Sequence, residues 1–277
     1  MKAKYLKRIA EALERLAPPP PPAVDLNQGD AFVWLGEKGC FDPVLKVNRV
    51  EIKLLQGIDQ QKELLLKNTR QFAKGFPANN ALLWGARGAG KSSLVKAVHK
   101  AVGAMVLVEI HRDEISTLPQ LLKILRQSPR RFLLFCDDLS FDAGESSYKS
   151  LKAMLEGGIE GRPENVLFYA TSNRRHLMAR EMIENEGSSA IHTGETAEEK
   201  LSLSDRFGLW LGFHNIDQAT YFDIVIAYAQ EYDLKISRPE LEALANEWSR
   251  TRAMRSGRAA FQFIQDLAGK LKDEPSA

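Results

Sequence analysis

One glycine-rich turn constrains the fold of this chain more than any other feature of its sequence. Residues 81–97 read ALLWGARGAGKSSLVKA, in which a short apolar run leads into the turn and a helical pattern follows it. The spacing of the apolar residues predicts a buried strand over 81–84 and a helix over 92–100. A strand, a glycine-rich loop and a helix in this order indicate an α/β fold with a ligand site at the loop.

The loop contains the residue types that bind phosphate. Gly85, Gly90, Lys91 and Ser92 fill the pattern G-x-x-x-x-G-K-[ST]. Glycines let the backbone curl so that successive N–H groups point at an anion, and the following helix adds the positive end of its dipole. We expect Lys91 to reach the β- and γ-phosphates of ATP and the Ser92 hydroxyl to ligate Mg²⁺. The expected nucleotide contacts in this loop are Gly85, Ala86, Arg87, Gly88, Ala89, Gly90, Lys91, Ser92 and Ser93.

Strand-like and helical patterns alternate after this loop. Such alternation predicts a parallel sheet sandwiched by helices, the fold class of P-loop NTPases. The expected strands cover 104–110, 131–136, 166–170 and 207–213, and the expected helices cover 118–127 and 145–155. Beyond residue 217 the pattern is only helical, which predicts a small all-helical domain with helices over 219–232, 239–248 and 258–271.

Composition and pattern divide the chain into four predicted parts. A helical pattern over 2–16 meets five consecutive prolines, which form a stiff extended spacer. The four parts are the N-terminal helix with its spacer over 1–22, an N-terminal extension over 23–55, the α/β nucleotide-binding domain over 56–216 and the helical domain over 217–277. Within them a strand is expected over 32–35 and a helix over 58–72, and the polar segment 178–201 reads as a long exposed insertion.

Acidic and amide side chains follow two of the predicted strands. Asp137 and Asp138 come directly after an apolar run, and Asn173 follows the next strand. Strand ends in such sheets face the ligand crevice. We expect Asp137 to hold Mg²⁺ together with Ser92, and Asp138 to orient and polarise the attacking water. Asn173 is placed to position that water or to contact the γ-phosphate. The alternative interpretations are an acidic turn and a turn asparagine.

Arginines stand at two further places where a cation can act on phosphate. Arg206 precedes the last strand, from where it would reach the γ-phosphate of a neighbouring subunit. The alternative is a surface ion pair with Asp205 or a helix cap. Arg255 and Arg258 open a helix of the C-terminal helical domain, and a cation there would close over the bound nucleotide. The alternative is an ordinary basic helix start.

Taken in this order, the segments resemble an AAA+ ATPase. The resemblance covers roughly 56–271 and rests on GARGAGKSS, LLFCDD, the Asn173 strand end, SDRFG and SGRAA. Within AAA+ the chain is similar to the replication-initiator and helicase-loader branch, where two consecutive aspartates occur. It resembles most an uncharacterised bacterial AAA+ family, domain of unknown function 815, through LLWGARGAGKSSLVKA, TSNRRHL and EEKLSLSDRFGLWLGF.

The resemblance implies an α/β domain with a helical lid, ATP and Mg²⁺ bound between them, and ring or helical oligomers. It implies a sensor-1 role for Asn173, an arginine finger at Arg206 and a sensor-2 role for Arg258. It also implies that Gly57 and Ile58 lie near the adenine.

Two positions depart from the family pattern. Asp138 stands where a glutamate is usual, and its side chain is one methylene shorter. The sensor-2 arginine often falls at the position that Ala260 occupies here, so Arg255 stays open as an alternative to Arg258.

Composition sets the broad class of protein. The 277 residues are 44% hydrophobic and 27% charged, as in an ordinary folded domain, and the net charge of +2 gives no strong field toward nucleic acid or membrane. Cys40 and Cys136 do not look like a disulfide framework. No apolar run is long enough to span a bilayer and the N-terminus does not resemble a signal peptide, so we expect a cytoplasmic protein.

Three functions remain open at this level. The favoured one is an ATPase that couples ATP hydrolysis to oligomer-dependent remodelling or loading of an unknown protein client. A P-loop phosphotransferase would need an acceptor pocket, and the separate helical domain argues against it. The third is a slow nucleotide-gated binding module that associates with DNA. The basic residues at 174–176 and at Arg250, Arg252 and Arg255 lack the interleaved aromatic residues of a single-strand platform.

Overall fold

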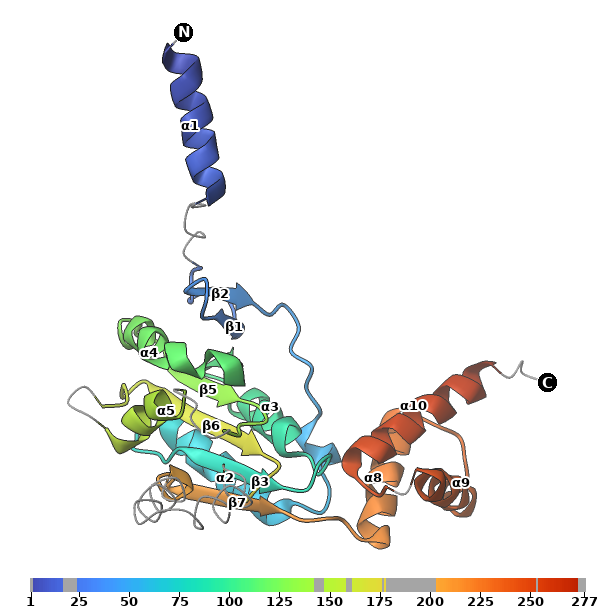
Figure 1. Cartoon of the computed structure of the whole chain (residues 1–277). Coiled ribbons are helices and arrows are strands. Elements are labelled where there is room, and N and C mark those ends of the chain that lie inside the picture. The colour runs from blue at the N-terminus through green and yellow to red at the C-terminus, as the bar shows by residue number, and fades with distance from the viewer. Residues whose placement is uncertain are drawn as a thin grey trace, which may run out of the picture.

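A single sheet organises the first two thirds of the molecule. The computed structural model describes residues 2–16, 24–141, 147–157, 161–175, 177, 203–252 and 254–273. Among these residues seven strands form one sheet in the order β2-β1-β4-β5-β6-β3-β7 (Figure 1). The strands are β1 Ala31–Leu35, β2 Cys40–Pro43, β3 Ala81–Gly85, β4 Val106–Ile110, β5 Phe132–Cys136, β6 Val166–Ser172 and β7 Leu209–Phe213.

All neighbouring strands pair in parallel except β1 and β2. The parallel arrangement brings the carboxyl ends of β3, β5 and β6 to the same edge of the sheet. The phosphate loop, the two aspartates and Asn173 follow these three strands, so the fold gathers them at that edge. The expected extension over 23–55 supplies β1 and β2 and so widens the same sheet, because β1 pairs with β4.

Helices cover both faces of the sheet, which explains why the central strand β5, FLLFC, is apolar throughout. α2 Asp59–Ala73 and α3 Lys91–Val102 pack on one face, and the short helix η2 Arg112–Thr117, α4 Leu118–Arg126 and α5 Ser147–Glu156 pack on the other. Alternate residues of β5 point to opposite sides: Phe132 and Leu134 lie in one core, and Leu133 and Phe135 lie in the other. All four are fully buried.

Three helices form a separate core beyond the carboxyl ends of the strands (Figure 1). They are α8 Gln218–Glu231, α9 Arg238–Thr251 and α10 Gly257–Asp273. The Asp217 carboxylate caps α8 by accepting a hydrogen bond of 2.8 Å from the Thr220 N–H. Leu54, from the short helix η1 Ile52–Leu54, packs into this core, so the segment before α2 contacts the C-terminal helices.

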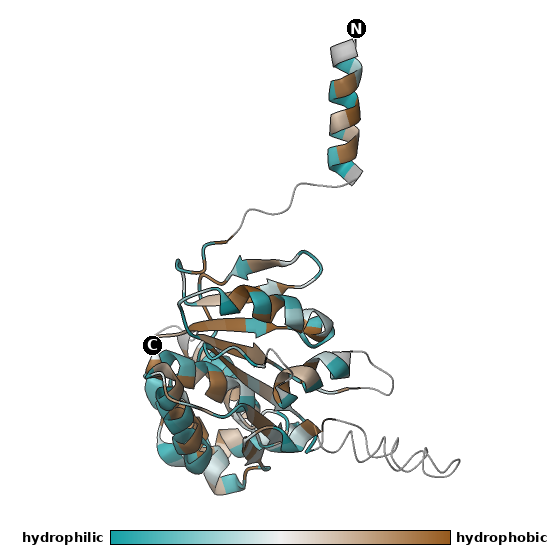
Figure 2. Cartoon of the chain, turned by 90° about the vertical axis from the view of Figure 1, so that its left-hand side faces the viewer, coloured by the Kyte–Doolittle hydropathy of each residue, from teal (hydrophilic) through white to brown (hydrophobic). Residues whose placement is uncertain are grey.

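The first helix stands apart from the rest of the described chain. α1 Lys2–Leu16 projects away from the sheet (Figure 2). Its apolar residues stay exposed, with Leu6 at 66%, Ile9 at 55% and Leu13 at 58% of their full accessible area. Within the described ranges, no helix is both long enough and apolar enough to cross a bilayer. The prolines at 18–22 and the expected insertion at 178–201 lie outside the described residues.

Candidate functional site

A cavity of about 700 Å³ lies where the phosphate loop, the segment before α2 and the C-terminal helices meet. Most of the residues that the sequence singled out line it. These are Ile58, Arg87, Gly88, Ala89, Gly90, Lys91, Ser92, Ser93, Asp137, Asp138, Asn173 and Arg258. Gly85 and Ala86 lie directly behind Lys91, whereas Gly57 and Arg206 are not among the lining residues.

Close backbone approaches require glycine in the phosphate loop. Gly85 has φ +125°, and a Cβ atom there would lie 2.0 Å from the carbonyl oxygen of Phe213. Gly88 has φ +73°, and its Cβ would lie 2.9 Å from the Ser256 hydroxyl oxygen. The Arg258 N–H donates to the Gly88 carbonyl at 3.3 Å. The loop is therefore held between the end of β7 and the start of α10, and a larger residue would displace it.

The ammonium group of Lys91 is buried at the base of the loop. It donates to the carbonyl oxygens of Gly85 at 2.9 Å and Ala86 at 2.8 Å, and to Asn173 Oδ1 at 3.0 Å. The side chain is 6% exposed, and burial lowers its pKa from the ordinary value of 10.5. A buried cation with three neutral acceptors and two nearby aspartates is suited to bind an anion, because a phosphate would supply the missing negative charge.

Asp137 accepts hydrogen bonds from two hydroxyl groups. Ser92 Oγ donates to Asp137 Oδ1 at 2.6 Å, and the Thr171 hydroxyl donates to the same oxygen. A serine hydroxyl and a carboxylate side by side form a hard oxygen donor set, which suits Mg²⁺. Ser92 and Asp137 would therefore hold this ion. Among the described residues no group of three histidine, cysteine, aspartate or glutamate side chains forms a metal cluster.

Asp138 is oriented by the neighbouring strand. Its backbone N–H donates to the Thr171 hydroxyl oxygen at 2.9 Å, and its Oδ1 accepts from Asn173 Nδ2 at 2.6 Å. Its φ of +51° lies in the left-handed region, which aspartate tolerates better than most residues. Asn173 thus bridges Lys91 and Asp138, the cation and the carboxylate that would face the γ-phosphate.

The arginines occupy different places. Arg258 lines the cavity, whereas Arg255 is not one of its lining residues. Arg206 precedes β7, which is parallel to β3, so it lies at the opposite edge of the sheet from the phosphate loop. There it forms an ion pair with Glu156, at the end of α5, instead of the pair with Asp205 that was the alternative interpretation. The structure therefore does not bring Arg206 to the cavity of its own chain.

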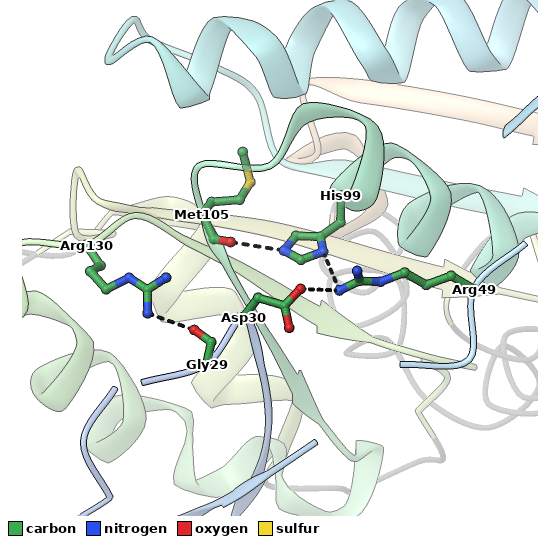
Figure 3. A network of polar contacts seen from close by, with 6 residues as sticks. All are labelled: Gly29, Asp30, Arg49, His99, Met105 and Arg130. Carbon is green, nitrogen blue, oxygen red and sulfur yellow. Dashed lines mark hydrogen bonds and ion pairs between the residues drawn. The ribbon is translucent and has the colours of Figure 1, made fainter. Parts of the chain in front are cut away.

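A polar network fastens the segment before α2, which forms one wall of the cavity. Arg49 lies between two lining residues, and its Nη2 donates to Asp30 Oδ2 at 2.9 Å and to His99 Nδ1 at 3.1 Å (Figure 3). Arginine only donates, so Nδ1 must accept and Nε2 must carry the proton that is donated to the Met105 carbonyl at 3.0 Å. Burial lowers the pKa of His99, and the hydrogen bond from Arg49 lowers that of Asp30.

Sequence reasoning missed much of the cavity wall. Thr171 ends a predicted strand, but its link to both aspartates depends on β5 and β6 being neighbours. The other missed residues come from the segment before α2, from α3, from the segment after β7 and from the C-terminal helices, and no local motif marks them. They are Asn48, Val50, Leu54, Leu55, Gln56, Lys96, Ile216, Ile224, Tyr228, Gly257 and Phe261. Their apolar side chains give one end of the cavity the surface that a nucleobase needs.

The sequence matches a known family over most of its length. The model of the family described as "Protein of unknown function (DUF815)" matches residues 27–271. No curated protein is similar to the chain in sequence.

Several solved structures have a similar fold. The RuvB Holliday junction branch migration motor of Thermotoga maritima matches with a TM-score of 0.56 and 17% identity, over 80% of this chain and 66% of that chain. A point mutant of the same protein matches with a TM-score of 0.56 and 17% identity, over 82% and 70% of the two chains. The chain thus spans just under two thirds of the length of the first match. At this identity the likeness shows the fold, which is the AAA+ fold.

Proposed function

The chain belongs to the DUF815 family, and from this premise and the geometry of the cavity we propose that it is a Mg²⁺-dependent ATPase of the AAA+ type. ATP binds in the cavity between the α/β sheet and the C-terminal helices, with its phosphates on the phosphate loop and its base toward the apolar end. Hydrolysis is coupled to remodelling or loading of a protein client by an oligomer of this chain in the cytoplasm.

One observation carries the proposal. One continuous series of hydrogen bonds links Ser92, Asp137, Thr171, Asp138 and Asn173, and Asn173 in turn accepts a hydrogen bond from Lys91. These residues come from two strand ends, those of β5 and β6, and from the start of α3, and all except Thr171 were expected to act on phosphate, metal or water. Thr171 and the other five all line the same cavity. A glycine-rich turn without a ligand would not need this convergence.

Each residue then has a defined task. Lys91 and the N–H groups at the start of α3 hold the β- and γ-phosphates. Ser92 and Asp137 hold Mg²⁺, which when bound neutralises charge on the phosphates. Asp138 accepts a hydrogen bond from the attacking water, and Asn173 fixes the direction of the Asp138 carboxylate. The Arg258 N–H donates a hydrogen bond to the Gly88 carbonyl, so Arg258 moves together with the phosphate loop.

Arg206 supplies the last charge from a neighbouring subunit. It lies at the edge of the sheet away from its own cavity, which supports a role in trans. In the chain itself it is paired with Glu156, so assembly must exchange this ion pair for the γ-phosphate of the neighbour. The active site is complete only between two copies.

ATP turnover per chain as a function of protein concentration tests this proposal. We expect the rate to rise steeply with concentration and then to reach a plateau, together with the molecular mass. A constant rate from a species that is monomeric at the lowest concentration contradicts the role of Arg206 in trans. Absence of ATP binding at any concentration contradicts the ATPase proposal as a whole.

A slow nucleotide-gated module is the second candidate, and one observation favours it. The Asp138 carboxylate is one methylene shorter than a glutamate and is already bonded to Asn173 at 2.6 Å. Both features reduce its reach toward a water molecule. A single-turnover measurement with excess protein separates the two candidates, because a gate holds ATP for many minutes whereas a motor hydrolyses about one ATP per second or faster.

A further inference from the structure

A second cavity, of about 530 Å³, borders the start of the phosphate loop at Gly85, Ala86 and Arg87. It shares Arg87 and Asn173 with the first cavity. Its other side chains come from the end of β3, the end of β6 and the residues after β7. Those that matter here are Trp84, Arg174, Arg175 and His214.

Flat rings and a guanidinium group stack at this cavity. The Arg175 guanidinium lies 5.4 Å from the centre of the Trp84 ring and 5.9 Å from that of Trp210. The two indole rings are 6.0 Å apart, and the His214 ring stands edge-on to Trp84 at 6.0 Å. Arg175 is exposed and both indoles are partly exposed. The cluster therefore offers a nucleobase a planar surface on which to stack.

The described side chains that line the cavity carry only positive formal charge. Arg87, Arg174 and Arg175 are all exposed, and no carboxylate among the described residues forms an ion pair with any of them. None of the described side chains that line the cavity is acidic. Three guanidinium groups in one cavity, with no acidic partner in the described part of the chain, favour an anionic ligand, and their forked geometry suits phosphate.

The sequence alone argued against a single-strand platform, because no aromatic residue is interleaved with the basic residues 174–176. The fold supplies the aromatic residues from elsewhere. Trp84 comes from β3 and Trp210 from β7, and the parallel pairing of these strands places both indoles beside Arg175. Cations and stacking surfaces, the two components of single-strand recognition, thus meet in one place.

We propose that this cavity binds single-stranded nucleic acid, with a base stacked on the layer of Arg175 and Trp84 and with phosphates on Arg87 and Arg174. A duplex does not fit this role, because its base faces are covered by their neighbours. Asn173 borders both cavities and accepts a hydrogen bond from Lys91. A nucleic-acid strand bound in the second cavity would therefore also affect the position of Lys91 in the phosphate loop. The binding itself does not rest on the proposed ATPase function, but this coupling does.

Fluorescence anisotropy of the full-length chain with a labelled oligothymidylate tests the proposal. We expect binding without added ATP, preference for the single strand over the same sequence as a duplex, and a fall of affinity with salt. Two phosphate contacts, at Arg87 and Arg174, predict a slope of about −1.4 in a plot of log K against log salt concentration. Binding should also quench tryptophan fluorescence, because a base stacks at Trp84.

Two double variants separate this cavity from general charge. Arg174→Ala with Arg175→Ala should weaken binding at least about 10-fold, since both phosphate and stacking contacts are lost. Arg70→Ala with Arg250→Ala removes the same charge from exposed positions on α2 and α9 and should leave affinity within about twofold. Equal weakening by both pairs overturns the proposal, provided that the melting temperatures show both variants folded.

Two further outcomes also overturn it. One is tighter binding of a polyglutamate peptide than of the oligonucleotide, which would assign the cavity to an acidic protein partner. The other is a Trp84→Phe variant that keeps the full quenching signal. If ATP turnover is absent but the strand still binds and the Arg174 and Arg175 variant fails to bind it, the nucleic-acid site stands and the ATPase proposal fails.

Discussion

Lys91 concentrates the chemistry of the phosphate loop in one buried cation. Its three hydrogen bonds go to neutral oxygens, so they bring no negative charge into direct contact with the ammonium. Burial lowers the pKa of Lys91, because a buried ammonium without a negative partner is less stable than a hydrated one. Replacement by alanine should weaken ATP binding about 10- to 100-fold or more, because charge-assisted hydrogen bonds contribute about 1.5–3 kcal/mol each. Calorimetric titration with ATP measures this. Lys67→Ala, at an exposed position on α2, is the control and should bind like the parent.

Asp138 tests the catalytic half of the site. Asp138→Asn keeps the shape and the position next to Asn173 but removes the negative charge that polarises water. We expect ATP affinity within about twofold of the parent and turnover reduced about 100-fold or more, the usual contribution of a general base. Steady-state phosphate release gives the rate and a fluorescent ATP analogue gives the affinity. Turnover at the parent rate would assign water activation to another group.

His99 makes folding stability depend on pH. Its pKa in the folded chain lies below the ordinary 6.5, so the unfolded chain binds a proton first as pH falls. Stability should therefore decrease as pH drops below about 6.5, by no more than about 1.4 kcal/mol per pH unit for one proton. Asp30 has a lowered pKa and stays ionised in this window.

The matched variant is His99→Gln, which can accept from Arg49 and donate to the Met105 carbonyl but does not titrate. Urea unfolding midpoints between pH 7.5 and 5.5 should vary less for this variant than for the parent chain. Equal pH dependence of the two proteins would show that other groups cause it.

For single residues, what the sequence could predict depends on whether the residue belongs to a local motif or reaches the site only through contacts between distant segments. Lys91, Ser92 and the aspartates belong to local motifs whose chemistry is visible within a few residues. Thr171 and Asn48 have no such motif, because their place in the site arises only when distant segments meet. The stacking of Arg175 on Trp84 is of the same kind: the two residues are far apart in the chain and adjacent strands bring them together.

Elements with strong periodicity were predicted well, and a short irregular one was not. The helices over 2–16, 118–127 and 258–271 agree with α1, α4 and α10 to within about two residues, the usual uncertainty of helix ends. β2 was missed. It has four residues, ends in Pro43 and pairs only with β1, so neither length nor alternation marks it as a strand.

The exposure of α1 predicts that this helix contributes little to folding stability. Its apolar residues are more than half exposed, so it buries nothing that would stabilise the fold. Deletion of residues 1–22 should shift the melting temperature by less than about 2 °C, the smallest shift that a loss of 1 kcal/mol would cause in a chain of this size. Differential scanning calorimetry measures the shift.

Leu65→Ala provides the comparison within a helix of the same length. α1 and α2 both have 15 residues, but Leu65 on α2 is fully buried. Its truncation should cost about 2–5 kcal/mol. A deletion as destabilising as this substitution would mean that α1 packs on the rest of the chain in solution.

At the scale of the whole molecule, the distance between Arg206 and the cavity makes assembly part of the chemistry. Two defective chains should therefore restore each other. The Lys91→Ala chain keeps Arg206, and the Arg206→Ala chain keeps the phosphate loop. A complete site therefore forms wherever a Lys91→Ala chain presents its Arg206 to the phosphate loop of an Arg206→Ala chain. An equimolar mixture should recover about a quarter of the parent turnover per chain if subunits mix at random and each site needs one neighbour. Turnover of the mixture equal to the mean of the separate variants would place the catalytic arginine within one chain, and Arg258, which already lines the cavity, would then be the residue to replace.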